Sequence, residues 1–243
     1  MRLDQAMVER GIAATRSQAR DLIMRGCIRI DGAIARKAGQ KIGSRVVIEV
    51  AEGTSPYISR GGLKLAAALR EFNLSASGRT ALDVGASTGG FTEVLLRAGA
   101  KRVYAVDVGR AQLHQSLRED PRVVSIEGVD ARRLTAADVA EPVGAIVADV
   151  SFISLTKALP AVLALASSDA WLVALIKPQF ELEPAAIGKG GIVRSPAARE
   201  RAVGNVRAWM ARQPGWRVVG VVSSPILGAS GNKEFLMVAR REP

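Results

Sequence analysis

From about residue 59 onward, short apolar runs alternate with helical stretches, and this alternation restricts the possible folds more than any other feature. Repeated strand–helix units of this length predict an α/β fold, with a mostly parallel sheet covered on both faces. No helical stretch separates the last two apolar runs, so we expect the final strand to be antiparallel. The predicted strands are 81–84, 103–106, 123–126, 145–148, 171–176, 218–222 and 235–239. The predicted helices are 91–98, 155–166 and 196–212, the last with Ser195 as its cap and Pro196 in its first turn.

The most apolar stretch, residues 158–176, approaches the ~20 residues that cross a bilayer. Pro160 stands near its start, and the polar residues 167–169 interrupt it. We therefore interpret it as an amphipathic helix, a turn and a buried strand. The first residues include an acid, Asp4, and no apolar run typical of a signal peptide. The sequence predicts a cytoplasmic protein with no membrane-spanning segment.

The first 58 residues have a different pattern, with two short helices followed by short strands. Residues 52–56 have the composition of a linker. We predict a small α+β domain over residues 1–58 and a larger domain over residues 59–243. In the small domain, Asp4 is the expected cap of the first helix, and Gly11 ends it. Thr15 or Ser17 caps the second helix, and Gly26 ends it. The expected strands are 27–30 and 46–50, with a turn at Asp31 and Gly32.

The charge balance is strongly basic, with 34 Lys and Arg against 23 Asp and Glu and a net charge of +11. Such an excess indicates a polyanionic partner, either nucleic acid or an anionic membrane surface, although a generally basic soluble enzyme fits as well. Cys27 is the single cysteine and His114 the single histidine, which excludes an internal disulfide and a Cys/His zinc cluster. A reducing cytoplasm fits this composition.

A glycine-rich loop follows the first strand of the larger domain. Its spacing, Gly-x-x-x-Gly-Gly, differs from the Gly-x-Gly-x-x-Gly of dinucleotide-binding proteins. S-adenosylmethionine carries no pyrophosphate but has a sulfonium and an ammonium, and an acid such as Asp83 suits these positive groups. The loop therefore favours this cofactor, while a simple tight turn remains the alternative. The candidate cofactor residues here are Asp83, Gly85, Ala86, Ser87, Gly89, Gly90 and Phe91.

Two further acids follow the next two strands. Asp107 ends the second strand, where a carboxylate can accept hydrogen bonds from both ribose hydroxyls. Asp130 comes just after the third strand and is placed to receive the adenine amino group. Arg110 leaves a phosphorylated cofactor as an alternative. Together with the loop, the two acids predict a cofactor site on three successive strand ends.

Five segments carry a resemblance to a known family: SRGGLKL from Ser59, LDVGASTGGFT from Leu82, ADVSFISL from Ala148, IKPQFE from Ile176 and GNKEFL from Gly231. Together they resemble the TlyA family of haemolysin-like 2′-O-ribose RNA methyltransferases, over essentially the whole chain. The resemblance implies an N-terminal RNA-binding module like that of a small-subunit ribosomal protein, joined to a Rossmann-like, FtsJ-like methyltransferase domain. It also implies S-adenosylmethionine as cofactor, ribosomal RNA or ribosomal subunits as partner and cytidine as target. We expect no metal, because the methyl donor is already activated.

The family's Lys-Asp-Lys-Glu tetrad falls on Lys64, Asp149, Lys177 and Glu234. We expect Lys177 to be the base for the 2′-hydroxyl, because burial and a second ammonium favour the neutral amine of a lysine. Asp149 would orient it, Lys64 would hold the nucleophilic oxygen or a phosphate, and Glu234 would position a lysine. An ion pair at a strand end, without catalysis, is the alternative for each residue.

Four arginines of the first domain are candidates for RNA contacts through phosphate and shape. Two of them, four residues apart, share one helix face. A solvated basic face is the alternative. At the level of the whole protein, the alternatives are a non-catalytic RNA-binding or ribosome-assembly factor and a membrane-active haemolysin. The four arginines are Arg16, Arg20, Arg29 and Arg36.

Overall fold

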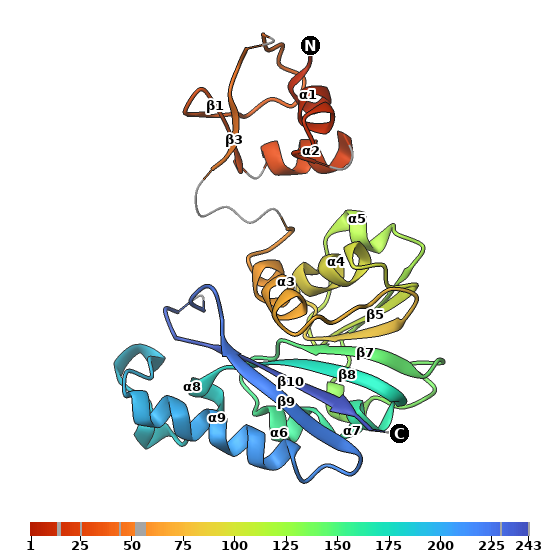
Figure 1. The fold of residues 1–243 in the computed structure, drawn as a ribbon, viewed down its shortest axis with the longest axis vertical. Coiled ribbons are helices and arrows are strands. Elements are labelled where there is room, and N and C mark those ends of the chain that lie inside the picture. Colours follow the sequence, from red (N-terminus) through yellow and green to blue (C-terminus); the bar gives the residue numbers. More distant parts are fainter. Residues whose placement is uncertain (14–15, 25, 44, 52–56, 229, 243) are drawn as a thin grey trace. The chain divides into compact units, whose positions relative to one another are not determined.

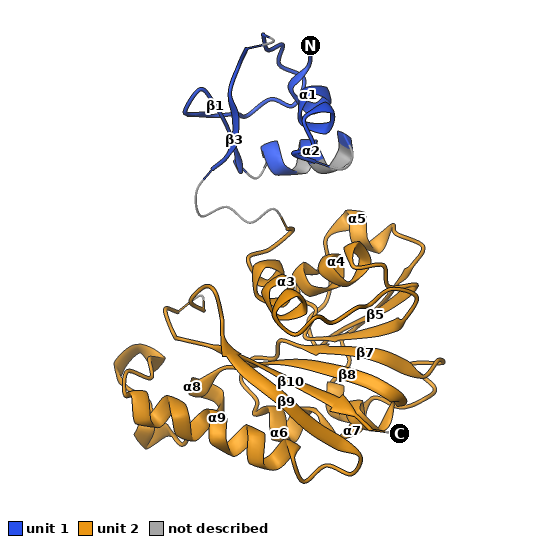
Figure 2. Cartoon of the chain, viewed as in Figure 1, with its two compact units in different colours: residues 1–56 blue, residues 57–243 orange. Residues whose placement is uncertain are grey.

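The computed structural model describes residues 1–13, 16–24, 26–43, 45–51, 57–228 and 230–242. It divides into two compact units, Met1–Pro56 and Tyr57–Pro243 (Figure 2). The sequence analysis placed the boundary after residue 58, and the division between the two compact units falls after residue 56. The Ile58 N–H donates to Glu93 Oε2 at 2.5 Å, and Tyr57 and Ile58 both pack against the core of the larger unit. The predicted linker, 52–56, lies outside the described residues.

The small unit packs two helices on a three-stranded antiparallel sheet of order β2-β1-β3. Leu3, Met7, Leu22, Ile23 and Ile28 form the centre of its core, and each is at most 1% exposed. Apolar residues therefore lie on one face of each helix, as amphipathic packing requires. The elements are α1 (Leu3–Glu9), α2 (Arg16–Met24), β1 (Ile28–Ile30), β2 (Ala33–Ile34) and β3 (Ile48–Val50).

The cap expected for the first helix needs correction, whereas one of the two candidates for the second helix lies outside the described residues. The N-cap of α1 is Arg2, without a side-chain cap, and Asp4 lies inside the first turn with no exposed surface. Its carboxylate binds arginines instead of helix N–H groups, because burial of a carboxylate requires charged partners. For α2, Ser17 lies within the helix, and Thr15 lies outside the described residues.

The large unit is built on a seven-stranded sheet of order β6-β5-β4-β7-β8-β10-β9 (Figure 1). Strands β4 to β8 are paired in parallel. The last strand, β10, is antiparallel to both β8 and β9, so the expectation for the final strand is confirmed. The strands are β4 (Thr80–Val84), β5 (Arg102–Asp107), β6 (Val123–Glu127), β7 (Val143–Ala148), β8 (Ala166–Ile176), β9 (Trp216–Ser223) and β10 (Phe235–Arg241).

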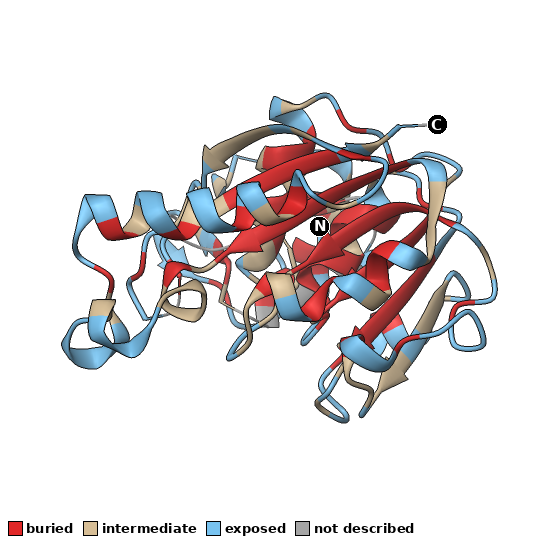
Figure 3. Cartoon of the chain, turned by 90° about the horizontal axis from the view of Figure 1, so that it is seen from below, coloured by how far each residue is buried: buried red, intermediate tan, exposed pale blue. Residues whose placement is uncertain are grey.

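Helices cover both faces of this sheet and create two apolar layers. One layer packs α3, α4 and α5 on the first face, and the other packs α6, α7 and α9 on the second. Strand residues alternate between the layers; Ala81 belongs to the first and Leu82 to the second. Figure 3 shows the central strands largely buried. The helices are α3 (Gly61–Glu71), α4 (Gly90–Arg97), α5 (Gln115–Arg118), α6 (Leu155–Ala158), α7 (Pro160–Ala164), α8 (Pro178–Glu181) and α9 (Pro196–Met210), and short 3₁₀ turns are η1 (Ala131–Arg133), η2 (Pro184–Ala186) and η3 (Lys189–Gly191).

Several element bounds differ from the sequence prediction. The helix expected over 155–166 is two short helices, because Pro160 begins a new one and has no N–H for the first. Residues 167–169, expected as a turn, belong to β8, which starts at Ala166. Helix α3 was not predicted, although its first turn carries the SRGGLKL segment. Ser195 does cap α9, where its Oγ accepts from the Ala198 N–H at 3.3 Å.

The part of the chain that the structure describes contains no helix both long and apolar enough to cross a bilayer.

Candidate active site

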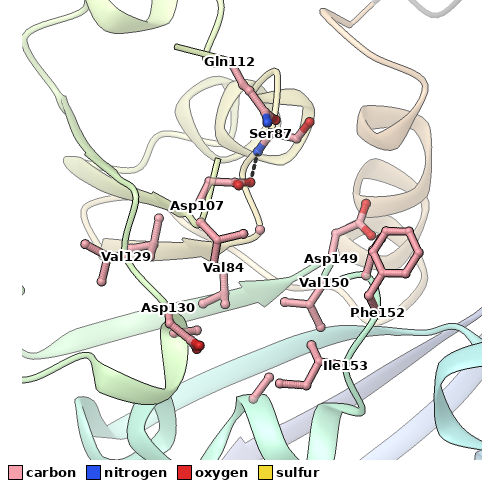
Figure 4. A pocket seen from close by; sticks show the side chains of 16 residues that line it. Val84, Ser87, Asp107, Gln112, Val129, Asp130, Asp149, Val150, Phe152 and Ile153 are labelled. Carbon is pink, nitrogen blue, oxygen red and sulfur yellow. Dashed lines mark hydrogen bonds between the residues drawn. The ribbon is translucent and has the colours of Figure 1, made fainter. Parts of the chain in front are cut away.

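The carboxyl ends of β4, β5 and β7 surround a cavity of about 320 Å³ (Figure 4). Ligands of open parallel sheets bind at this edge, because the loops there leave a crevice. Apolar side chains form much of the wall, and three carboxylates from different strand ends complete it. The apolar residues include Val84, Val106, Val129 and Ile153, and the carboxylates are Asp107, Asp130 and Asp149.

The glycine loop approaches the end of β7 closely. Gly85 has φ +83°, and a Cβ at this position would lie 2.5 Å from the Asp149 carbonyl oxygen. The Asp149 N–H donates to the Val84 carbonyl at 2.9 Å and extends the contact between the two strands. Gly89, with φ +97°, precedes α4, and a Cβ there would meet the end of the Leu117 side chain. Positive φ favours glycine at both positions, and at Gly85 the backbone contact also leaves no space for a side chain.

Asp107 holds two loops together at the floor of this cavity. Its Oδ2 accepts from the Ser87 N–H at 2.8 Å, as Figure 4 shows, and its Oδ1 accepts from the Gly109 N–H at 2.7 Å. Each carboxylate oxygen has a second lone pair, so the group can still accept from a ligand. The predicted ribose acceptor thus lies in the cavity wall with its orientation set by backbone donors.

Asp130 lies in the same wall and caps η1. Its carboxylate accepts from the Arg132 N–H at 3.0 Å and from the Arg132 guanidinium at 2.5 Å. These hydrogen bonds lower the pKa of Asp130 to about 2, so the group is ionised at neutral pH and acts only as an acceptor. This is the character that an acceptor for an amino group needs.

Asp83 occupies a different environment from the one expected. It has no exposed surface, and it is absent from the walls of the cavities described here. Its Oδ2 accepts from the Thr92 hydroxyl at 2.6 Å, whereas Oδ1 is buried without a hydrogen-bond partner. Burial raises the pKa of Asp83 to about 7, with a further contribution from the charge of Asp149. Asp83 therefore supports the loop from below instead of facing a cofactor directly.

A second cavity, also about 320 Å³, shares a wall with the first. It brings together four side chains, which come from α3, from the residues that directly follow β7 and β8, and from the segment before β10. The shared wall consists of Gly85, Ser87, Asp149 and Ser151. The four side chains are Lys64, Asp149, Lys177 and Glu234, the complete predicted tetrad.

The tetrad forms two lysine–carboxylate pairs. Lys64 Nζ donates to Glu234 Oε2 at 2.5 Å, and these side chains are only 9% and 4% exposed. Lys177 Nζ lies 2.7 Å from Asp149 Oδ1, with side chains 12% and 23% exposed. Lys177 also donates to Ser151 Oγ at 2.8 Å. The cavity therefore presents two lysine nitrogens, each beside a carboxylate, next to the glycine loop.

Comparison with known proteins agrees with this geometry. The model of the FtsJ-like methyltransferase family matches residues 57–241, which is the whole sheet with its helices. The chain belongs to the FtsJ-like methyltransferase family. Its fold is the predicted Rossmann-like methyltransferase sheet, and the chain is a methyltransferase. The S4 domain model matches residues 1–48 of the small unit.

Full-length relatives of this methyltransferase share both parts. The chain is 46% identical over 242 residues to the 16S/23S rRNA (cytidine-2′-O)-methyltransferase TlyA of Mycobacterium tuberculosis, covering 99% of this chain and 90% of that protein. It is 42% identical to Hemolysin A of Brachyspira hyodysenteriae, over 97% of this chain and 98% of that protein. A solved structure of a hemolysin from Streptococcus thermophilus matches with a TM-score of 0.77 and 41% identity, over 100% of this chain and 88% of that one. The resemblance to the TlyA family is confirmed.

In the S4 domain of this methyltransferase, Asp4 gathers three arginines. Its carboxylate lies 3.0 to 3.2 Å from nitrogen atoms of Arg2, Arg16 and Arg20, whose side chains remain about half exposed, at 42%, 47% and 52%. The Arg2 guanidinium and, more weakly, the two others lower the pKa of Asp4. The predicted pair on α2 thus belongs to one cluster, to which sequence analysis had not added Arg2.

The other two arginines predicted to bind RNA are exposed but lie on other elements. Arg29, on β1, donates to the Gly32 carbonyl at 2.7 Å, and Arg36 follows β2.

In the methyltransferase domain, Ala86, Gly90 and Phe91 line the second cavity, which contains the tetrad and is called the tetrad cavity below. Three further residues line this cavity and were not predicted as site residues, although they belong to the family-like segments: Ser59, Arg60 and Ser151.

Proposed function

We propose that this enzyme transfers a methyl group from S-adenosylmethionine to the 2′-hydroxyl of a cytidine ribose in ribosomal RNA. The observation that carries the proposal is the pairing of two lysines with two carboxylates in one cavity beside the glycine loop. A ribose hydroxyl is a poor nucleophile that must lose its proton during attack, and a held lysine can receive it. The M. tuberculosis relative, a 16S/23S rRNA (cytidine-2′-O)-methyltransferase, supports cytidine and ribosomal RNA as the target.

The residues around the first cavity fit S-adenosylmethionine. At Gly85, φ is positive and the Asp149 carbonyl lies close by. A side chain would fill this space, whereas glycine leaves it open, so that a ligand can approach the backbone. Asp107 offers fixed acceptors for ribose hydroxyls, and Asp130 offers an ionised acceptor for an amino group. The apolar wall suits an adenine ring. When bound, the cofactor supplies a methyl group already activated by its sulfonium, so no metal is required.

Within the second cavity, the chain's own residues handle the proton. The Lys177 nitrogen receives the proton of the 2′-hydroxyl, and Asp149 holds that nitrogen and balances the positive charge that results. The ammonium of Lys64 donates to the 2′-oxygen or to a neighbouring phosphate. Glu234 keeps this ammonium in place and compensates its burial.

The S4 domain supplies RNA affinity in this proposal. The exposed arginines around Asp4, together with Arg29 and Arg36, contact phosphates and bind structured RNA mostly by shape. The partner is ribosomal RNA, free or in a ribosomal subunit, and an enzyme that acts on it works in the cytoplasm. A protein that only binds RNA is the rival function, and it predicts binding without methyl transfer.

The test uses variants of Lys177 and labelled S-adenosylmethionine, with ribosomal subunits or ribosomal RNA as acceptor and mapping of 2′-O-methylated nucleotides. Lys177→Ala should fold and bind cofactor but lose at least ~100-fold in rate, the low end for general-base catalysis. Lys177→Arg should fail similarly, because a guanidinium keeps its proton. Lys101→Ala, a change at an exposed lysine that pairs with Glu141, is the control.

Three results of this test would contradict the proposal. An active Lys177→Arg variant would show that the position supplies only positive charge. Methylation mapped to a base would exclude the ribose as acceptor. RNA binding without methyl transfer by the unaltered protein would favour the rival function.

A further inference from the structure

The turn after β7 holds Ser151 in a defined place. On one side, the Asp149 N–H donates to the Val84 carbonyl at 2.9 Å. On the other side, Ser154 caps α6 and donates to Glu181 Oε2 at 2.5 Å. Between them Phe152 has φ +64°, a left-handed conformation that bulky residues seldom adopt. The turn is therefore fixed at both ends, and its strained backbone is kept by the surrounding contacts.

Ser151 and Asp149 from this turn hold the same nitrogen atom. Lys177 Nζ donates to Ser151 Oγ at 2.8 Å and lies 2.7 Å from Asp149 Oδ1. The lysine follows the buried end of β8 and precedes Pro178, so its backbone is fixed too. Ser151 lines both the first cavity, proposed to bind the cofactor, and the tetrad cavity, and it lies in their shared wall.

This arrangement has a consequence for a neutral lysine amine. Its nitrogen is tetrahedral, with one bond to Cε, two N–H groups and one lone pair. When Ser151 accepts one N–H, two staggered directions remain for the lone pair, and the negative charge of Asp149, 2.7 Å away, disfavours the direction that faces its carboxylate. With Asp149 alone, the amine could rotate about its Cε–Nζ bond and turn the lone pair away from the ribose.

We propose that Ser151 is a positioning residue of the reaction: together with Asp149 it fixes the rotation of the Lys177 amine, so that the lone pair meets the 2′-hydroxyl proton. This inference rests on the proposed function, in which Lys177 is the base. A misdirected base costs rate without costing affinity, since cofactor and RNA keep their contacts. Ser151 is exposed, so removal of its hydroxyl creates no buried cavity.

The experiment compares Ser151→Ala and Ser151→Thr in the full-length protein under single-turnover conditions. Ser151→Ala should lower the methyl-transfer rate by roughly 10- to 100-fold, as expected for a misaligned reacting group, with unchanged cofactor affinity and KM for RNA. Ser151→Thr keeps the hydroxyl and should restore most of the rate. The control is Ser167→Ala, at the opposite end of β8, where the hydroxyl donates to the Val143 carbonyl at 3.2 Å.

A double variant decides whether Ser151 acts through Lys177. In a Lys177→Ala background, Ser151→Ala should cause no further loss, because the residue it positions is gone. An equal loss in both backgrounds, a fully active Ser151→Ala variant, or an inactive Ser151→Thr variant would overturn the inference. These outcomes differ from failure of the proposed function, in which Lys177→Ala would keep its activity or the unaltered protein would not methylate ribose.

Discussion

The buried pair of Lys64 and Glu234 allows a sharp test of whether the tetrad stabilises the fold, carries the chemistry, or does both. Lys64 Nζ and Glu234 Oε2 are 2.5 Å apart, and the two side chains are 9% and 4% exposed. Glu234→Leu leaves an ammonium without its partner in a nearly dry site, which costs about 3–5 kcal/mol in the free energy of unfolding. For a domain of this size, that corresponds to a fall in melting temperature of roughly 6–20 °C.

Replacement of both partners separates the two roles. In Lys64→Met/Glu234→Leu no unpaired charge is buried, so most of the lost stability should return. Methyl transfer should remain absent, because the cavity then lacks the Lys64 ammonium. The control is Glu242→Gln, which breaks an exposed pair with Arg217 and should hardly change stability.

Tryptophan fluorescence is the appropriate assay for this cycle. All three tryptophans, Trp171, Trp209 and Trp216, belong to the methyltransferase unit, so denaturation followed by fluorescence reports on that unit alone. The assumption of a coupled buried pair is refuted if Glu234→Leu lowers the free energy of unfolding by less than about 1 kcal/mol. It is also refuted if the loss in the double variant equals the sum of the losses in Lys64→Met and Glu234→Leu.

Three further predictions concern the cofactor loop and the S4 domain. Because the folded pKa of Asp83 is raised to about 7, the folded state binds more protons than the unfolded state between about pH 4 and 7, and stability should fall by roughly 4 kcal/mol as pH rises through this range. Asp83→Asn, whose amide oxygen can still accept from the Thr92 hydroxyl, should remove this pH dependence of the free energy of unfolding. If the variant shows the same pH dependence in unfolding titrations, Asp83 is not its cause. Asp107→Ala should weaken S-adenosylmethionine binding at least ~10-fold in calorimetry, since charge-assisted hydrogen bonds are lost, and unchanged affinity would remove it from the site. Arg29→Ala/Arg36→Ala should weaken RNA binding and reduce its log–log salt slope by roughly one for each lost phosphate contact, with cofactor affinity unchanged; a constant slope would argue against phosphate contacts.

Much of the fold followed from the sequence alone. The alternation of apolar runs with helical stretches predicted the sheet and its antiparallel last strand, because period and chain connection are local properties. Local signals, a glycine loop and a strand-end acid, also predicted Gly85 and Asp107 as cofactor residues, and both line the first cavity. The bounds were less accurate where Pro160 divided one helix into two.

Only the tertiary structure decided which groups share a partner. The family resemblance led us to expect that Asp149 orients Lys177, but it left open which lysine Glu234 holds, because Lys64 and Glu234 are 170 positions apart. The tertiary structure also decided burial. Asp83, predicted as a cofactor ligand, is buried beneath the loop, and Asp4, predicted as a helix cap, is the centre of an arginine cluster. Sequence states which charges exist, whereas their solvation and partners depend on how distant elements pack.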